Sequence, residues 1–255
     1  MNPVAFLLAA AQGARLRRAT EILPPATGPT RGVVPGPSDR TAVRLLVIGD
    51  STAAGVGAAN HEEAIAGSLA RLAAEDVGSA VEWRVIARSG ATSRRVRHSL
   101  LPELEASDPF DLAVVLVGVN DVLARRHPDQ WQEDVAAVLA RVTGRAGLVV
   151  MTGIPPFDRF PSMPGTLGRY LTRRGRRLDE VAERLCRDQE RIVWIDSAGL
   201  LADDAEFFAR DGFHPSATGY QTWATAIWRR ARTKLVPPAG FEPTTFCSGG
   251  RRSIH

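Results

Sequence analysis

The chain has 255 residues, of which 44% are hydrophobic and 24% are charged, and its formal net charge is +4. This length and apolar content predict a globular protein with a buried core. The basic excess consists almost entirely of arginines in scattered groups, a pattern typical of solvated helix faces, so we expect no nucleic-acid partner. The two cysteines, Cys186 and Cys247, are too few for a disulfide framework, and this low number is compatible with a reducing compartment.

Residues 1–40 are predicted to form an N-terminal helix and a linker. The apolar stretch Val4–Ala11 is too short to span a bilayer. No basic residue precedes it and three arginines follow it, the reverse of the order in a secretory signal. We therefore expect a cytoplasmic protein whose amphipathic helix packs on the domain, with contact to a membrane surface as the less favoured alternative. Residues 24–40 are rich in Pro, Gly and small polar residues and predict a linker that does not pack.

Residues 41–236 are predicted to form one α/β domain. Five apolar runs predict strands: Leu45–Ile48, Val81–Ala87, Leu112–Val117, Leu148–Thr152 and Ile192–Ile195. Four segments have helical spacing: Glu62–Ala74, Gln130–Val142, Leu167–Arg187 and Ala217–Arg232. Apolar strands that alternate with helices are typical of a parallel sheet covered on both faces. With right-handed crossovers, the result is a three-layer α/β/α sandwich with a five-stranded parallel sheet.

Polar motifs follow the carboxyl ends of these strands, where open α/β sheets bind their ligands. Asp50-Ser51 follows the first strand, Ser89-Gly90 the second, and the segment 118–121 the third. The segment 211–214 comes after the fifth strand and directly before the last helix. Motifs far apart in the sequence are therefore expected to meet at one rim of the sheet.

Three of these residues fit the parts of a serine hydrolase, which needs a nucleophile, a base and a group that orients the base. Ser51 is the candidate nucleophile, although a serine after a strand is also a common N-cap. His214 is the candidate base, because it alone of the five histidines stands three residues after an aspartate. On a tight turn Asp211 reaches the imidazole and selects its tautomer. The same segment also fits an ordinary turn before a helix.

Asn120 and Gly90 are candidate donors to the oxyanion of a tetrahedral intermediate. The Asn120 amide is neutral and does not titrate, and one such donor is worth roughly 3–4 kcal/mol of transition-state stabilisation. Asn-Asp also makes Asx-turns readily, which is the structural alternative. Gly90 has no side chain, so its N–H allows close approach of a substrate. The Ser51 N–H would be the third donor.

Together these motifs resemble those of the SGNH hydrolases, also called GDSL-type esterases and lipases. The residues that carry the resemblance are Gly49-Asp50-Ser51, Gly90, Gly118-Val119-Asn120-Asp121 and Asp211-Gly212-Phe213-His214. The name GDSL refers to a Gly-Asp-Ser-Leu motif, and in this chain Thr52 takes the place of the leucine. The resemblance implies a flavodoxin-like fold, hydrolysis of acyl esters through an acyl-enzyme, and no metal or other cofactor. It also implies an oxyanion hole made by the Ser51 and Gly90 N–H groups and the Asn120 side chain.

Other classes fit the sequence less well. No serine has the Gly-x-Ser-x-Gly setting of an α/β-hydrolase, and Gly55-Val56-Gly57 lacks the third glycine of a dinucleotide fingerprint. A metal hydrolase could draw its ligands from Asp203, Asp204, Asp211 and His214, but the sequence has no pair of ligands spaced along one helix. Asp196 is a rival for the acid but is expected to cap the turn after the fifth strand.

Three alternatives stay open: an acyltransferase, a carbohydrate O-deacetylase and a non-catalytic binding module. Transfer to an alcohol uses the same acyl-enzyme as hydrolysis, so the sequence does not separate the two. The expected partner is a small-molecule ester. In the loop 154–164, Phe157, Phe160 and Met163 either line an acyl pocket or cover the edge of the sheet.

The tail from residue 237 to 255 is predicted to be disordered, because Gly, Pro, Ser and Thr dominate it and no strand or helix period follows. Phe241-Glu242-Pro243 fits codons close to the T-loop core of transfer RNA genes. We interpret the tail as read-through into such a gene.

Overall fold

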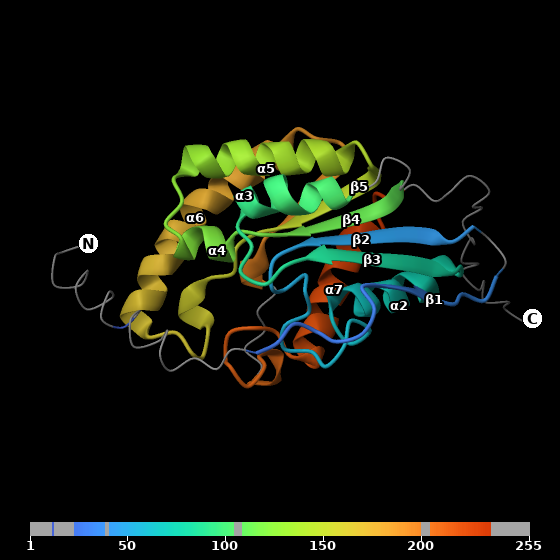
Figure 1. Ribbon diagram of the computed structural model, residues 1–255, viewed down its shortest axis with the longest axis horizontal. Coiled ribbons are helices and arrows are strands. Elements are labelled where there is room, and N and C mark those ends of the chain that lie inside the picture. Colours follow the sequence, from blue (N-terminus) through green and yellow to red (C-terminus); the bar gives the residue numbers. More distant parts are fainter. Residues whose placement is uncertain (1–11, 13–22, 39–40, 105–108, 200–204, 236–255) are drawn as a thin grey trace, which may run out of the picture.

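A six-stranded sheet forms the centre of the computed structural model, which describes residues 12, 23–38, 41–104, 109–199 and 205–235 (Figure 1). The strands lie in the order β1-β3-β2-β4-β5-β6. Strands β2 to β6 run parallel, and β1 pairs with β3 antiparallel. Their bounds are β1 (Arg31–Val34), β2 (Val43–Gly49), β3 (Val81–Ala87), β4 (Phe110–Leu116), β5 (Ala146–Thr152) and β6 (Ile192–Ile195).

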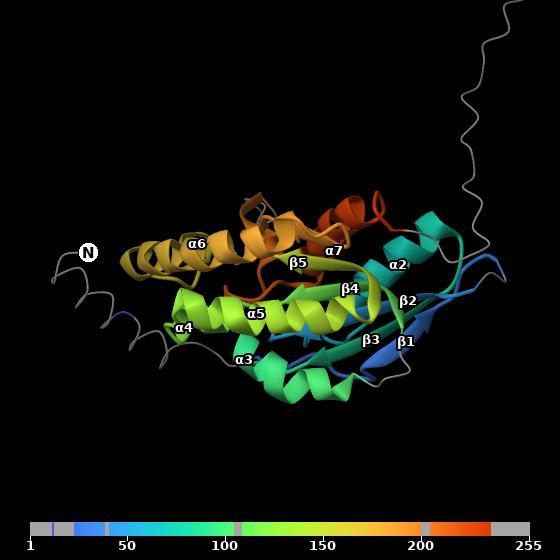
Figure 2. The same cartoon turned by 90° about the horizontal axis from the view of Figure 1, so that it is seen from above.

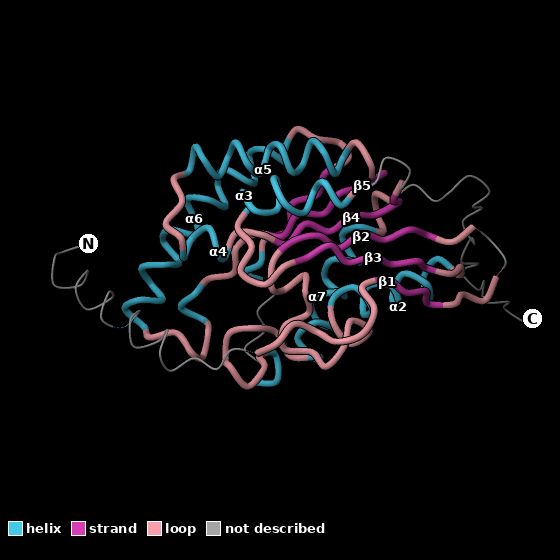
Figure 3. The backbone as a smooth tube through the Cα atoms, in the orientation of Figure 1, coloured by secondary structure: helices cyan, strands magenta, loops and turns pink. Residues whose placement is uncertain are grey.

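Helices cover both faces of this sheet (Figures 1 and 2). Helices α2 (Ile65–Val77) and α7 (Ala217–Ala231) pack on one face. Helices α3 (Ser93–Arg95), α5 (Pro128–Thr143) and α6 (Gly165–Arg187) lie on the other, and α4 (Val119–Leu123) follows β4. Figure 3 shows helices, strands and loops along the backbone in separate colours. Five short helical turns lie among the described residues: η1 (Val96–Leu100), η2 (Leu101–Glu103), η3 (Phe157–Arg159), η4 (Ser197–Gly199) and η5 (Ala205–Phe207).

The sheet divides the hydrophobic core into two layers. Along β2, Leu46 and Ile48 belong to the layer under α5, whereas Leu45 and Val47 belong to the layer under α2 and α7. Because both faces are covered, the strand is apolar at nearly every position instead of alternating. The predicted three-layer α/β/α sandwich is confirmed, with the five predicted strands as β2 to β6.

The number of strands differs from the prediction, because part of the predicted linker forms β1. Arg31 lies opposite Arg84 and Val34 opposite Val81, which adds an antiparallel edge to the sheet. Gly32 leaves room for the ring of Trp83, since a Cβ at this position would lie 2.5 Å from that ring. Cross-strand packing of this kind stabilises a short edge strand that its own sequence does not predict.

Two predicted features lie outside the described residues: the N-terminal helix, of which only Gln12 is described, and the tail 237–255. Within the described ranges, no helix combines the length and the apolar character needed to cross a membrane.

Candidate active site

Ser51 lies on a tight turn at the carboxyl end of β2. Gly49 makes this turn possible, because its φ is 156° and a Cβ there would lie 1.9 Å from the carbonyl oxygen of Leu116. The Asp50 N–H donates to that same oxygen at 3.0 Å, and the Asp50 carboxylate accepts from the N–H of Thr52 at 3.0 Å. The backbone is therefore fixed on both sides of Ser51, which stands at the rim with 8% of its surface exposed.

His214 and Asp211 approach Ser51 from the turn that precedes α7. The Oγ of Ser51 lies 3.0 Å from Nε2 of His214, and Nδ1 of His214 lies 2.6 Å from Oδ2 of Asp211. The other carboxylate oxygen of Asp211 accepts from the N–H groups of Phe213 and His214 at 2.9 and 3.0 Å. The structure thus brings the three predicted residues into one hydrogen-bonded chain.

The environment of Asp211 favours its ionised form. Burial raises the pKa of this carboxyl, but the hydrogen bonds from the His214 ring and from the two N–H groups outweigh burial and hold the pKa below its usual value. An ionised Asp211 accepts the Nδ1 proton of His214, which leaves Nε2 free to accept a proton from Ser51.

The predicted oxyanion donors lie on the two neighbouring loops. Gly90 is exposed and has a φ of +77°, a conformation that favours glycine. Nδ2 of Asn120 donates one hydrogen to the carbonyl oxygen of Ala91 at 3.0 Å. Its nearest other acceptor is a carboxylate oxygen of Asp50, at the long distance of 3.4 Å. The bond to Asp50 is the longer and weaker of the two, so it is the one that a ligand oxygen at this rim would replace.

Asp121 is a part of the site that the sequence analysis did not single out. Its side chain is fully buried and accepts from the N–H and the Oγ of Ser93, at 2.8 and 2.7 Å. Burial raises the pKa of Asp121 to about 6, against the bonds from Ser93 and the charge of Arg126. Asn120 and Asp121 together fasten the loop of Gly90 to the loop after β4. The Asn-Asp pair was the available signal, but nothing in the sequence pointed to Ser93.

Asp50, directly before Ser51, is a second buried carboxyl. Burial raises its pKa to about 7, the Thr52 N–H lowers it, and the charge of Asp121 raises it again. Near neutral pH this carboxyl carries a proton in a large fraction of molecules.

The structure places Phe157, Phe160 and Met163 in the core. Phe157 is fully buried, and Phe160 and Met163 are 5% and 7% exposed. The ring of Phe160 packs edge-on against Phe213, with the ring centroids 4.9 Å apart. All three side chains are packed inside the protein, and their contact with a substrate stays a prediction.

Asp196, the rival acid of the sequence analysis, has a different role. Asp196 accepts from the N–H of Ala198 at 2.8 Å and so caps the turn after β6. Asp203 and Asp204 lie outside the described residues. In the part of the chain that the structure covers, no three or more His, Cys, Asp or Glu side chains are grouped to hold a metal ion.

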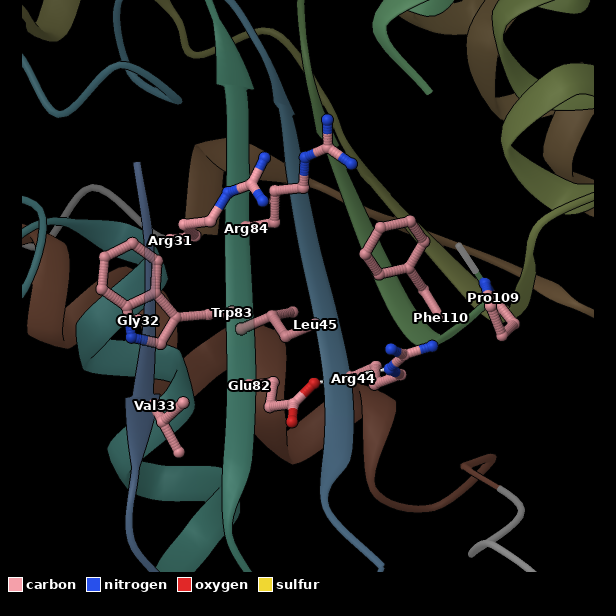
Figure 4. Close-up of a pocket in the computed structure, with 10 residues that line it drawn as sticks. All are labelled: Arg31, Gly32, Val33, Arg44, Leu45, Glu82, Trp83, Arg84, Pro109 and Phe110. Carbon is pink, nitrogen blue, oxygen red and sulfur yellow. Dashed lines mark hydrogen bonds and ion pairs between the residues drawn. The ribbon is translucent and has the colours of Figure 1, made fainter. Parts of the chain in front are cut away.

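A cavity of about 280 Å³ lies elsewhere on the sheet, over β1, β3, β2 and β4 (Figure 4). Arg31, Arg44 and Arg84 line it, and Arg44 pairs with Glu82 at 3.4 Å. Leu45 lines the cavity four residues before β2 ends at Gly49, which is roughly 13 Å in extended chain. The cavity is therefore separate from the rim that holds Ser51 and His214.

The fold and the rim residues define a class: an α/β/α sandwich of the SGNH-hydrolase type, with a serine, a histidine and an aspartate at the carboxyl ends of its strands. The chain belongs to the GDSL-like lipase/acylhydrolase family, whose model matches residues 47–222. The match covers every rim motif from Gly49 to His214, and the resemblance predicted from the sequence is confirmed.

Individual proteins are also similar to this chain. A GDSL-like esterase from Mycobacterium tuberculosis is 29% identical over 199 residues, which are 76% of this chain and 63% of that protein. This chain thus spans less than two thirds of the relative's length. Among solved structures, TesA has a TM-score of 0.61 at 23% identity, over 75% of this chain and 99% of TesA. A family 3 carbohydrate esterase from Clostridium thermocellum has a TM-score of 0.60 at 14% identity, over 76% of this chain and 98% of that one.

Proposed function

We propose that this protein is a serine esterase that hydrolyses carboxylic acyl esters through an acyl-enzyme on Ser51. One observation carries the proposal: the hydrogen-bonded chain from Ser51 Oγ to His214 Nε2 at 3.0 Å, and from His214 Nδ1 to Asp211 Oδ2 at 2.6 Å. This is the arrangement that moves a proton from a serine to a base while a carboxylate stabilises the imidazolium.

The mechanism has two halves. Ser51 Oγ attacks the ester carbonyl while His214 takes its proton, and the tetrahedral oxyanion is bound by the N–H groups of Ser51 and Gly90 and by the Asn120 amide. His214 then gives the proton to the leaving alcohol, which leaves an acyl group on Ser51. In the second half a water loses its proton to His214 and attacks the acyl carbonyl, and Ser51 regains its proton as the acid departs.

The test is a panel of p-nitrophenyl esters from acetate to palmitate, assayed with the wild-type protein and with Ser51→Ala and His214→Ala. We expect hydrolysis that a chelator does not inhibit and that falls by a factor on the order of 10³ or more in both variants. A fluorophosphonate should label Ser51 in the wild-type protein. Hydrolysis that survives Ser51→Ala would rule out the acyl-enzyme, and absence of both labelling and hydrolysis would favour a binding module.

Two further arms separate the alternatives. An acetylated oligosaccharide belongs in the panel because one protein of the same fold is a carbohydrate esterase. Added alcohols test for acyl transfer, since a transferase forms the new ester at the expense of the free acid.

A further inference from the structure

The loop that carries Ser51 needs support from outside itself. This nucleophile loop, residues 50–61, contains no regular helix or strand, and its two glycines, Gly55 and Gly57, have φ values of 71° and 100°. Glycines of this kind lose much conformational freedom when they are ordered. Inside the loop, Ala54 N–H donates to Asp50 O at 2.9 Å and Val56 N–H to Ser51 O at 3.0 Å. Besides the bonds of Asp50, the position of Ser51 therefore also depends on how Ala54 and Val56 are held.

One support comes from α7, below the loop. The fully buried Tyr220 donates its hydroxyl to the carbonyl oxygen of Val56 at 2.7 Å. The neighbouring Gly57 packs tightly against the turn of His214, since a Cβ at Gly57 would lie 2.2 Å from the carbonyl oxygen of Pro215. A shift of this loop would therefore change the distance between Ser51 and His214.

The other support is a segment that the sequence predicted to be a linker. We call residues 23–34 the N-terminal strap. Its Ala26 N–H donates to Ala54 O at 3.0 Å, and its Thr27 donates to Ala59 O through both N–H and Oγ1, at 3.1 and 2.8 Å. The Thr27 carbonyl oxygen accepts from His61 N–H at 3.2 Å. Four hydrogen bonds thus join the strap to the nucleophile loop.

The strap is itself anchored to rigid parts of the molecule. Its last four residues are β1, which pairs with β3. Thr30 accepts from the N–H of Val85 at 2.7 Å, and Leu23 is buried. Figure 1 shows the strap in dark blue, running from the edge of the sheet across the loops below its rim. The nucleophile loop is therefore held between this strap and Tyr220.

We propose that the N-terminal strap is a positioning element that holds the nucleophile loop so that Ser51 stays within hydrogen-bond distance of His214. This inference rests on the proposed function for its effect on catalysis. The strap precedes residue 47, where the family match begins, so it lies outside the matched residues.

Full-length point variants test the proposal without disturbing the core. Thr27 is exposed, so Thr27→Pro removes both donors to Ala59 O but no core packing. Thr27→Val removes the hydroxyl alone. Ser38→Ala is the matched control, because Ser38 lies just beyond the strap and donates to Gly78 O at the far end of the sheet.

In Thr27→Pro we expect the amides of Ala54, Val56 and His61 to exchange hydrogen about tenfold faster. We also expect kcat to fall about tenfold, with KM within about threefold of wild type. Thr27→Val should show a smaller change in the same direction, and Ser38→Ala should match wild type. Thermal melting of each variant shows that the domain stays folded.

Two results would overturn the proposal. One is unchanged exchange of the loop amides in Thr27→Pro, which decides the matter even if the wild-type protein proves to hydrolyse no ester. The other is faster exchange with kcat within about twofold of wild type, because Ser51 would then be positioned without the strap. Failure of the proposed function looks different: the wild-type protein itself would then be inactive and would not label on Ser51.

Discussion

Asp121 joins the two loops that supply the predicted oxyanion donors. The Oγ of Ser93 donates to its fully buried carboxylate at 2.7 Å, so Ser93→Ala leaves a buried charge with one donor fewer. We expect a loss of roughly 1.5–3 kcal/mol in the free energy of unfolding. We also expect kcat for p-nitrophenyl acetate to fall about tenfold, because the loop of Gly90 is held less tightly. Urea titration and steady-state kinetics measure the two effects.

The neighbouring Thr92 provides the control for Ser93→Ala. Its side chain accepts from the N–H of Arg95 and so caps α3, without contact to Asp121. Thr92→Ala should cost about 1 kcal/mol of stability and leave kcat unchanged. If both variants lower kcat equally, the contact between Ser93 and Asp121 has no special part in positioning Gly90.

Single residues of the site differ in how far the sequence predicts them. Ser51, Asp211 and His214 stand in short motifs whose order along the strands already indicates one rim. Ser93 and Thr27 have no such motif, because their contacts exist only once distant loops meet. A serine at a helix start and a threonine between prolines have common local explanations, so nothing local marks them.

The loop between β5 and α6 braces the turn that carries Asp211 and His214. Ser162 donates to the carbonyl oxygen of Gly212 through its N–H at 3.1 Å and its Oγ at 2.9 Å, and Phe160 packs on Phe213. We expect Phe160→Ala to cost about 3–5 kcal/mol of stability and to slow hydrolysis of all chain lengths by a similar factor. Kinetics across the ester panel below the melting temperature provide the measurement.

The acyl-pocket interpretation predicts a different result for Phe160→Ala. If the Phe160 ring lines the pocket, its removal should change which acyl length is preferred. Esters whose acyl group does not reach the ring should then be hydrolysed as by the wild-type protein. Val138→Ala is the matched control, because Val138 is fully buried in α5 in the same core layer. It should lower stability and leave kcat unchanged.

The sequence predicts a strand well where both faces of that strand are buried, because the strand then appears as a long apolar run, as in β2 and β4. Strand β1 does not, because Arg31–Val34 is short and lies among prolines and glycines. It is an edge strand whose stability comes from β3, and Val33 remains 62% exposed. The local pattern therefore predicts a linker, and only the pairing partner explains the strand.

The whole domain carries buried carboxyl groups whose protonation couples folding to pH. Burial raises the pKa of Asp50 and of Asp179 to about 7 and that of Asp121 to about 6, well above the usual value for an aspartate. The native state therefore holds protons that the unfolded chain has already released. Such a group stabilises the fold below its unfolded pKa, and this contribution is lost as the pH rises through the folded value.

We expect the free energy of unfolding to fall by at least about 2 kcal/mol between pH 5 and pH 8, measured by urea titration. Asp211 does not oppose this trend, because its pKa is lowered and its contribution is lost only at more acidic pH. Asp179 accepts from Ile154 N–H at 2.8 Å, so Asp179→Asn keeps an acceptor and removes the titration. That variant should show a weaker decline, whereas Glu62→Gln, at an exposed position, should keep the wild-type slope. Stability that rises over this pH range would mean that these carboxyl groups are ionised and paired in the native state.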